Sequence, residues 1–313
     1  MFESDSLVKF GVKNKNILAD HYKLNVYNEK LSSVFDNKYE MVLLAQSTGL
    51  STPKSILISR IIDGPLPPIN YPYIVKPITS KASRSFKLKG AIIQNENELH
   101  NFLKDYKHLS QDLFLQEYTS GPDSDVYQFH AYVDRDGKIL ASCTSRKIHQ
   151  YKPGMGIGSL VINSPNPSIS RVSVKFIRDI AYQGPVSLEF KYNSKNKCFD
   201  FIEINPRRTL HHLLLSKCGC NLSLTEYLDL VGQKQKSPFS IKKSKIYLWT
   251  KADSELKRCL YLPFNNSFKS VFTALRNILR TDVFPVYDFY DPAPFLLFLN
   301  LTFRRLLNKS NAF

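Results

Sequence analysis

The segment CFDFIEINPRR, residues 198–208, constrains the fold of this chain more than any other stretch. It has the aromatic and β-branched composition of a strand, in which side chains two apart point to the same face. Glu203 and Asn205 therefore share one face, while Ile202 and Ile204 share the other. An unpaired carboxylate on a buried face costs several kcal/mol. The pattern thus requires a partner for Glu203.

The preceding segment GPVSLEFKYN, residues 184–193, supplies that partner if the two segments form a hairpin about NSKNK. Glu189 then lies across from Glu203, and like charges directly opposite in a sheet destabilise it. A hard cation removes the repulsion, because carboxylate and amide oxygens suit Mg²⁺, which keeps further positions for phosphate oxygens. We therefore hypothesise that Glu189, Glu203 and Asn205 are metal ligands and that Arg207 lies beside phosphates. The alternative is a hairpin with these charges on a solvated face, and spacing alone leaves both open.

Three further segments carry polar residues at positions where a ligand could use them. Lys76 ends the apolar segment YPYIVKP, either as a phosphate contact or as an edge-strand lysine. Within LFLQEYTSGPDSD a strand ends in Gln116-Glu117-Tyr118, where backbone groups become free to bond a planar base. Arg146 and Lys147 precede the glycine-rich stretch GMGIGS, which either holds an anion or forms a flexible loop.

The net charge limits the class of partner. Lys and Arg outnumber Asp and Glu by 43 to 27, which gives +16 and permits nucleic acid, an anionic membrane surface or phosphate-bearing ligands. The cations are scattered along the chain, so we expect no nucleic-acid partner. The five cysteines include no CxxC pair, and the N-terminus lacks an apolar signal segment. These features predict free thiols and a cytoplasmic protein.

The order of expected elements predicts an α+β fold. We expect a short helical pattern at residues 16–24 and a helix from residue 35 to Gly49. Short strands are expected at SILIS, YIVKP and LFLQEY, and a hairpin over residues 126–147 around Asp-Arg-Asp-Gly. SISRVSVKFIRDIAYQG reads as a helix before the Glu189–Glu203 hairpin, and KSPFSIKKSKIYLWTKAD as a crossing strand after it.

Taken in order, these segments resemble the ATP-grasp superfamily, in the branch of carboxylate–amine ligases similar to the carbamoyl-phosphate-synthase ATP-binding domain. The resemblance runs over about residues 36–232. It implies ATP and Mg²⁺ (or Mn²⁺) as cofactors, with Glu189, Glu203 and Asn205 on the metal and with Arg207 and Lys147 as catalytic residues at the transferred phosphoryl group and the phosphates. The nucleotide-binding residues that it implies are Lys38 and Lys76 at the phosphates, Gln116, Glu117 and Tyr118 at the adenine, and Asp125 at the ribose.

The resemblance also implies a domain organisation in which two α+β subdomains clasp ATP. Residues 36–120 would form the small lid subdomain with its preceding helix, and residues 121–232 the large subdomain with the metal site. Residues 1–35 would be a remnant of the Rossmann-like domain that usually precedes this fold and is here truncated or absent; a partner chain or a dimer could supply it. Residues 233–313 would form a C-terminal extension with an amphipathic helix. The phosphate-covering loop KPITSKASRSFKLKG lacks glycines before its end, so Ser80, Ser83 and Ser85 would have to serve.

The implied activity is an ATP-dependent carboxylate–amine ligase that forms an amide or peptide bond through an acyl phosphate and releases ADP and phosphate. The alternative is a non-catalytic ATP-grasp-like scaffold that binds a nucleotide. The sequence does not identify the acid or the amine substrate, and amino acids, peptides and sugar acids are all candidates. His211 and His212 are expected in the core or the substrate pocket, and adjacent positions face apart.

The tail PFLLFLNLTFRRLLNK, residues 294–309, places apolar residues on one broad helical stripe with Arg304, Arg305 and Lys309 largely beside it. Such a helix can lie in a membrane interface, which would put the protein peripherally at the inner membrane surface. The alternative is a C-terminal helix docked on the core, which uses the same stripe.

Overall fold

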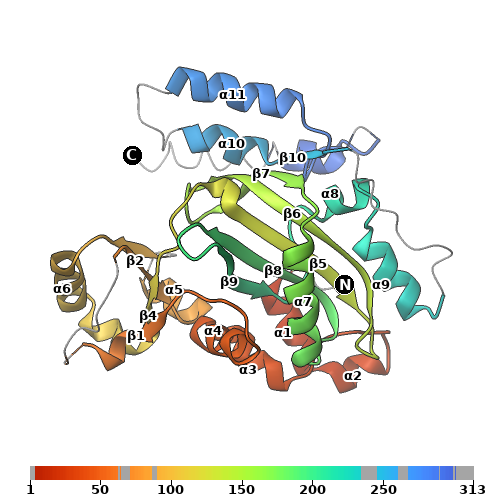
Figure 1. Cartoon of the computed structure of the whole chain (residues 1–313). Helices are drawn as coiled ribbons and strands as arrows, with labels where there is room; N and C mark the ends of the chain where they lie inside the picture. The colour runs from red at the N-terminus through yellow and green to blue at the C-terminus, as the bar shows by residue number, and fades with distance from the viewer. Residues whose placement is uncertain are drawn as a thin grey trace.

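The computed structural model describes residues 4–62, 64, 71–86, 90–233, 245–259, 267–288, 290–298 and 300. These residues form two antiparallel sheets with helices around them, in agreement with the predicted α+β class (Figure 1). The smaller sheet has the strand order β1-β4-β2-β3, and the larger one has the order β10-β7-β6-β5-β8-β9.

The four-stranded sheet lies within the predicted small subdomain. Its strands are β1 (Ser55–Leu57), β2 (Tyr73–Pro77), β3 (Ala91–Ile93) and β4 (Leu113–Glu117). Two helices accompany the sheet, α5 (Ser80–Phe86) and α6 (Glu96–Asp105), and two 3₁₀ turns cover Ile58–Arg60 and Lys107–Asp112. Helix α6 begins where the Asn95 side chain accepts a hydrogen bond from the Glu98 N–H at 2.9 Å. Leu99, Phe102 and Leu103 then bury one face of α6 against the sheet.

The six-stranded sheet carries most of the core. Its strands are β5 (Val126–Val133), β6 (Ile139–Tyr151), β7 (Ile157–Asn163), β8 (Gly184–Asn193), β9 (Cys198–Asn205) and β10 (Leu248–Thr250). One face of the sheet is apolar, because Phe129, Leu188 and Phe201 are fully buried in one cluster with Ile169 and Phe176 of helix α7 (Pro167–Asp179). Figure 1 shows α7 lying across this sheet.

The opposite face of the same sheet is polar, because the side-chain period of two sends alternate residues there. The register pairs Gln128 with Glu189 and Glu189 with Glu203, and Gln128 also pairs with Ser145 on β6. The predicted hairpin and the position of Glu189 opposite Glu203 are therefore confirmed. A row of polar side chains crosses four adjacent strands, and this row is the floor of the site described below.

The N-terminal segment is more ordered than its sequence pattern suggests. It forms α1 (Asp5–Lys13), α2 (Lys15–Ala19) and α3 (Lys30–Asp36), and Val8 and Val12 of α1 join the core beneath the six-stranded sheet. The predicted helix that follows is α4 (Lys38–Ser47), in which the Asn37 side chain accepts from the N–H groups of Tyr39 and Glu40. It ends before Gly49, whose φ of 83° suits glycine.

The C-terminal part contributes to the large sheet. The expected crossing strand contains β10, which pairs with β7 and buries Trp249. The helices α8 (His212–Lys217), α9 (Leu222–Leu230), α10 (Ala252–Arg258) and α11 (Ser267–Leu279) accompany it, and residues 293–298 are also helical. Residues 301–313, most of the tail predicted to be amphipathic, lie outside the described residues. In the part of the chain that is described, no helix is long and apolar enough to cross a membrane.

Candidate functional site

A cavity of about 580 Å³ lies between the two sheets, with residues of both in its walls. It brings together ten of the eleven site residues predicted from the sequence, and Asp125 is the exception. The ten are Lys38, Lys76, Gln116, Glu117, Tyr118, Lys147, Glu189, Glu203, Asn205 and Arg207. Ser80 and Ser83 also line it, but from helix α5 rather than from the expected loop, and Ser85 is not in its wall.

Cations converge on one side of this cavity. The Lys76 ammonium, on β2, donates to the Gln116 side-chain oxygen at 2.8 Å. Burial and the neighbouring Lys38 ammonium lower the pKa of Lys76 to about 8. Lys191, two residues beyond Glu189 on β8, also lines the cavity, and burial lowers its pKa too. The period of two along β8 could have identified Lys191 from the sequence. Such a group of cations suits a polyanionic ligand.

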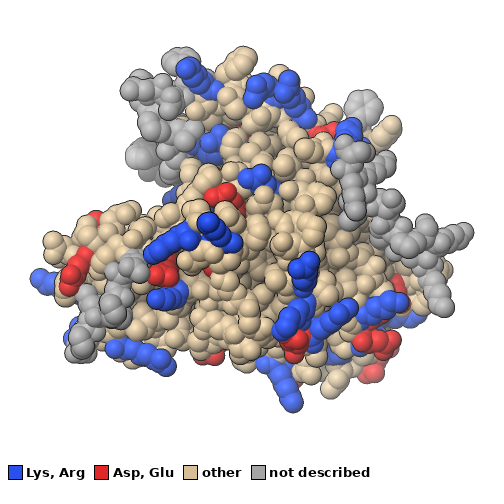
Figure 2. Space-filling model, in the orientation of Figure 1, with Lys and Arg blue, Asp and Glu red and all other residues tan. Residues whose placement is uncertain are grey.

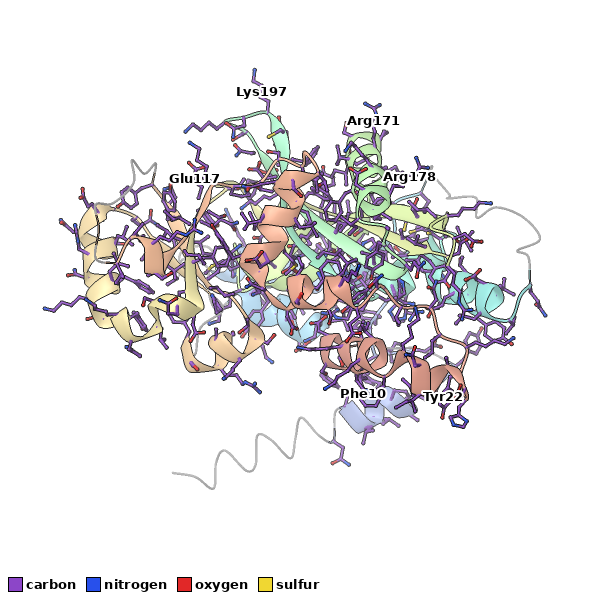
Figure 3. The ribbon with its side chains drawn as sticks, turned by 90° about the horizontal axis from the view of Figure 1, so that it is seen from below. Phe10, Tyr22, Glu117, Arg171, Arg178 and Lys197 are labelled. Atoms are coloured by element: carbon purple, nitrogen blue, oxygen red, sulfur yellow. The ribbon has the colours of Figure 1, made fainter. Side chains whose placement is uncertain are left out.

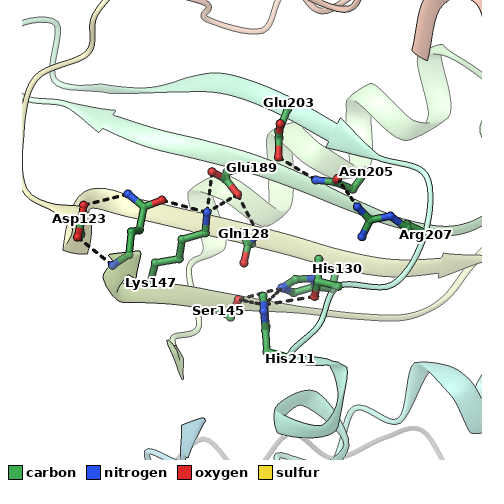
Figure 4. A network of polar contacts seen from close by, with 12 residues as sticks. Asp123, Gln128, His130, Ser145, Lys147, Glu189, Glu203, Asn205, Arg207 and His211 are labelled. Atoms are coloured by element: carbon green, nitrogen blue, oxygen red, sulfur yellow. Dashed lines mark hydrogen bonds and ion pairs between the residues drawn. The ribbon is translucent and has the colours of Figure 1, made fainter. Parts of the chain in front are cut away.

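Two carboxylates face these cations from the floor of the cavity. The Lys147 ammonium lies 2.8 and 2.9 Å from the two oxygens of Glu189, and Gln128 donates to the same carboxylate at 2.9 Å (Figure 4). Burial, aided by the facing Glu203, raises the pKa of Glu189 despite Lys147. Burial would also raise the pKa of Glu203, but Lys147, Lys38 and the Asn205 hydrogen bond outweigh it and lower that pKa.

The predicted metal ligands fit a hard divalent cation by residue type. The Asn205 amide nitrogen donates to Glu203 at 3.1 Å, and its oxygen accepts from Arg207 at 3.3 Å (Figure 4). A half-turn of the amide would place its oxygen beside the Glu203 carboxylate. Among the described residues no three His, Cys, Asp or Glu side chains form a metal-binding group. A cation here would therefore depend on two carboxylates, one amide and oxygens of the ligand itself, as Mg²⁺ in nucleotide sites does.

Arg207 makes a contact that nothing in the sequence indicated. Its Nε lies 2.7 Å from Asp5 Oδ1 and its Nη2 lies 3.3 Å from Asp5 Oδ2, a forked pair that joins residues 202 positions apart. Its Nη1 also donates to the Arg208 carbonyl at 3.2 Å. These bonds fix the plane of the guanidinium at the edge of the cavity. Asp5 lies at the start of α1, so the N-terminal helices help to build the site.

The segment Gln116–Tyr118 differs from its expected form. The N–H groups of Glu117 and Tyr118, expected to be free, donate to the carbonyls of Lys54 at 2.8 Å and Pro72 at 3.0 Å. Lys54 lies directly before β1 and Pro72 directly before β2, the two neighbours of β4, and their carbonyls accept these hydrogen bonds. The segment still lines the cavity, where the apolar side chains Ile74, Phe114 and Ile202 also lie. These apolar residues offer a surface on which a planar ring could stack.

Asp125, predicted to hold a sugar hydroxyl, is not among the residues that line the cavity. Asp125 ends the 3₁₀ turn Asp123–Asp125 and lies outside the cavity wall. Asp123, at the start of the turn, accepts hydrogen bonds from the N–H of Gln150 at 2.9 Å, from the Gln150 side chain at 2.9 Å and from the N–H of Gly154 at 2.8 Å. This carboxylate anchors the glycine-rich loop, of which residues 154–158 line the cavity.

A group of neutral polar side chains lies next to the carboxylates. The Nε2 atoms of His130 and His211 are 3.4 Å apart, and Ser145 Oγ lies 2.9 Å from the first and 3.3 Å from the second (Figure 4). Burial lowers the pKa of His130 to about 3 and that of His211 well below its usual range, so both are neutral near pH 7. His211 lines the cavity with Trp249, whereas His212 turns toward the Thr209 carbonyl.

The family model for the carbamoyl-phosphate synthase L chain, ATP binding domain, matches residues 67–226. A D-aspartate ligase from Enterococcus faecium is 22% identical over 246 residues, which cover 74% of this chain and 58% of the ligase. The chain thus spans less than two thirds of the length of that relative.

Two solved structures share the fold. N5-carboxyaminoimidazole synthetase from Staphylococcus aureus, complexed with ADP, has a TM-score of 0.60 and 16% identity, covering 79% of this chain and 64% of the synthetase. The biotin carboxylase domain of 2-oxoglutarate carboxylase from Hydrogenobacter thermophilus, in complex with MgADP, ADP and bicarbonate, has a TM-score of 0.59 and 18% identity. That match covers 78% of this chain and 55% of the carboxylase.

Proposed function

Because the chain belongs to the family of the carbamoyl-phosphate synthase L chain ATP-binding domain and has the ATP-grasp fold, we propose that it is an ATP-dependent carboxylate–amine ligase. In this proposal it forms an amide or peptide bond and releases ADP and phosphate. The likeness to a D-aspartate ligase supports a carbon–nitrogen bond-forming reaction.

We place the nucleotide across the cavity between the two sheets, which correspond to the two proposed subdomains, residues 36–120 and 121–232. The adenine would lie along Gln116–Tyr118 against Ile74 and Ile202, and the phosphates would lie among Lys38, Lys76 and Lys147. The convergence of these cations and the lowered pKa of Lys76 support this placement, because a bound polyanion would offset the mutual repulsion of the lysines.

Glu189, Glu203 and Asn205 would hold Mg²⁺ (or Mn²⁺) in this arrangement. When bound, the cation would neutralise phosphate oxygens and relieve the repulsion between the two carboxylates. The raised pKa of Glu189, which faces Glu203, supports a cationic occupant at this position.

The reaction then has two steps. An oxygen of the carboxylate substrate attacks the γ-phosphorus, the bond to the β-phosphate oxygen breaks, and ADP leaves an acyl phosphate behind. The amine nitrogen next attacks the acyl carbon, the bond to the phosphate oxygen breaks, and the amine loses a proton as phosphate departs. Lys147 and Arg207 would stabilise the negative charge on the transferred group, and the remaining contribution of the protein is positioning.

We place the acid and the amine at the end of the cavity lined by Thr209, His211 and Trp249. Gln128, beside Glu189, and Trp249 both belong to the cavity lining, and Gln128 Oε1 and Trp249 Nε1 are buried without a hydrogen-bond partner among the described residues. Buried polar atoms of this kind are ordinarily paired, so a substrate that bonds to them is favoured. The neutral imidazole of His211 can accept or donate at the same end. Amino acids, peptides and sugar acids all remain candidates.

One observation carries the proposal, namely that Glu189 and Glu203 face each other in a cavity lined by five cations, Lys38, Lys76, Lys147, Lys191 and Arg207. The test is phosphate release from ATP across a panel of carboxylates crossed with a panel of amines. We expect release that requires one acid and one amine together. Tight ATP binding with no release for any pair would indicate the nucleotide-binding scaffold instead.

We also keep two proposals about partners. A partner chain or a second copy of this chain would contact the protein and contribute residues to the site. The amphipathic tail, residues 294–309, would contact the inner membrane surface of a cytoplasmic enzyme, although its residues from 301 onward lie outside the described part of the chain.

A further inference from the structure

Helix α11 carries apolar side chains that are exposed rather than packed against the rest of the protein. The exposed fractions are 40% for Val271, 71% for Phe272, 46% for Leu275 and 87% for Leu279. The helix lies outermost above α10, at the edge of the molecule opposite α1–α4 (Figure 1). Its inner side is packed, because Ala274 is fully buried and the Asn277 side chain donates to Glu255 of α10 at 3.4 Å.

The exposed side chains form one stripe. At about 100° of rotation per residue, the four lie within an arc of about 100° around the helix axis. The packed residues Ala274 and Asn277 lie on another side. The stripe is therefore a continuous apolar surface along the helix, separate from the face that holds α11 to the protein.

Cations lie along one border of this stripe. Lys269 and Arg276 of α11 are exposed, and they lie about 60° and 40° beyond the apolar arc around the helix axis. Arg280 is exposed as well and follows directly after the last residue of the helix. Helix α11 contains no Asp or Glu. Figure 2 shows Lys and Arg side chains over the part of the surface where Figure 1 places α10 and α11. The surface thus combines an apolar stripe with a strip of one charge.

We propose that α11 is a membrane-binding helix that lays its stripe, Val271, Phe272, Leu275 and Leu279, into the interface of an anionic bilayer. Lys269, Arg276 and Arg280 contact the lipid headgroups. An interfacial helix combines these two features, because apolar side chains enter the acyl boundary while adjacent cations bind anionic headgroups. The net charge of +16 gives the same sign to the molecule as a whole. This inference stands apart from the ligase proposal, since α11 contributes no residue to the cavity.

The test is flotation of the full-length protein with phosphatidylcholine vesicles, with and without phosphatidylglycerol. We expect flotation only with the anionic vesicles and a loss of it at high salt. The variant Phe272→Ser/Leu279→Ser should weaken binding roughly tenfold or more, since two exposed apolar side chains are removed without touching the core. Lys269→Gln/Arg276→Gln/Arg280→Gln should weaken binding by a comparable factor.

The matched control removes three cations elsewhere. Arg171→Gln/Arg178→Gln/Lys197→Gln changes exposed residues on α7 and on the β8–β9 turn, which Figure 3 labels together on one side of the molecule. This control should float like the wild type. No flotation of the wild type, or equal flotation of the α11 variants, would overturn the proposal. So would a change in oligomer mass in Phe272→Ser/Leu279→Ser by sedimentation, because the stripe would then be an interface between copies. Ligase activity without lipid should be equal in all variants.

Discussion

Glu189 and Glu203 face each other on β8 and β9, and Lys147 contacts only the first of them. If Glu203 binds the cation, Glu203→Gln should lower turnover at least roughly 100-fold, because a neutral amide cannot replace a carboxylate that neutralises phosphate charge. The variant should keep a cooperative thermal unfolding transition. Glu40→Gln, an exposed change on α4, is the matched control and should be fully active. Near wild-type turnover in Glu203→Gln would refute the metal assignment.

Lys76 gives a prediction that depends on pH. Its pKa of about 8 in the free protein should rise when phosphates bind, since an anion stabilises the charged form. ATP binding at pH 8 should therefore take up about half a proton, and affinity should fall as pH rises above 8. Calorimetry in buffers of different ionisation enthalpy measures the uptake. Lys76→Met should lose most of it, and binding heats that are independent of the buffer in the wild type would contradict the assignment.

At the scale of elements, α1 is coupled to the site through Asp5 and Arg207. Asp5 is exposed enough that the pair adds little stability, but the fork orients the guanidinium. Asp5→Asn should lower kcat roughly tenfold while the Kd for ATP stays unchanged, because Arg207 loses its orientation rather than its charge. Asp5→Glu should restore most of the activity. Equal kcat in Asp5→Asn would mean that Asp5 has no positioning role.

The 3₁₀ turn Asp123–Asp125 contains two aspartates, and we expect their replacement by alanine to have different effects. Asp123→Ala removes the acceptor of three hydrogen bonds, two from Gln150 at the end of β6 and one from Gly154 of the glycine-rich loop. Amide exchange at Gly154 should therefore rise roughly tenfold or more, and ATP should bind more weakly. Asp125→Ala should leave both quantities unchanged, because Asp125 lies outside the cavity wall. Weaker ATP binding in Asp125→Ala alone would restore the ribose prediction for that residue.

Local sequence patterns predict some features of this fold, while others depend on contacts between distant parts of the chain. The hairpin that pairs Glu189 with Glu203 was predictable, because a period of two and a polar turn specify its register. Strand β10 was predictable as a strand, but its pairing with β7 joins residues that are 86 to 90 positions apart in the chain. The Asp5–Arg207 fork and the pairing of His130 with His211 arise only when distant elements come together, and no local pattern encodes them.

Formation of an acyl phosphate is the central claim, and trapping with hydroxylamine tests it most directly because the natural amine need not be known. The protein is incubated with ATP, Mg²⁺, hydroxylamine and a panel of amino acids, peptides and sugar acids, and hydroxamate and phosphate are both quantified. We predict that at least one acid gives hydroxamate in equal amount to phosphate and that Glu203→Gln gives neither. Tight ATP binding without hydroxamate or phosphate release for any acid would contradict the ligase assignment.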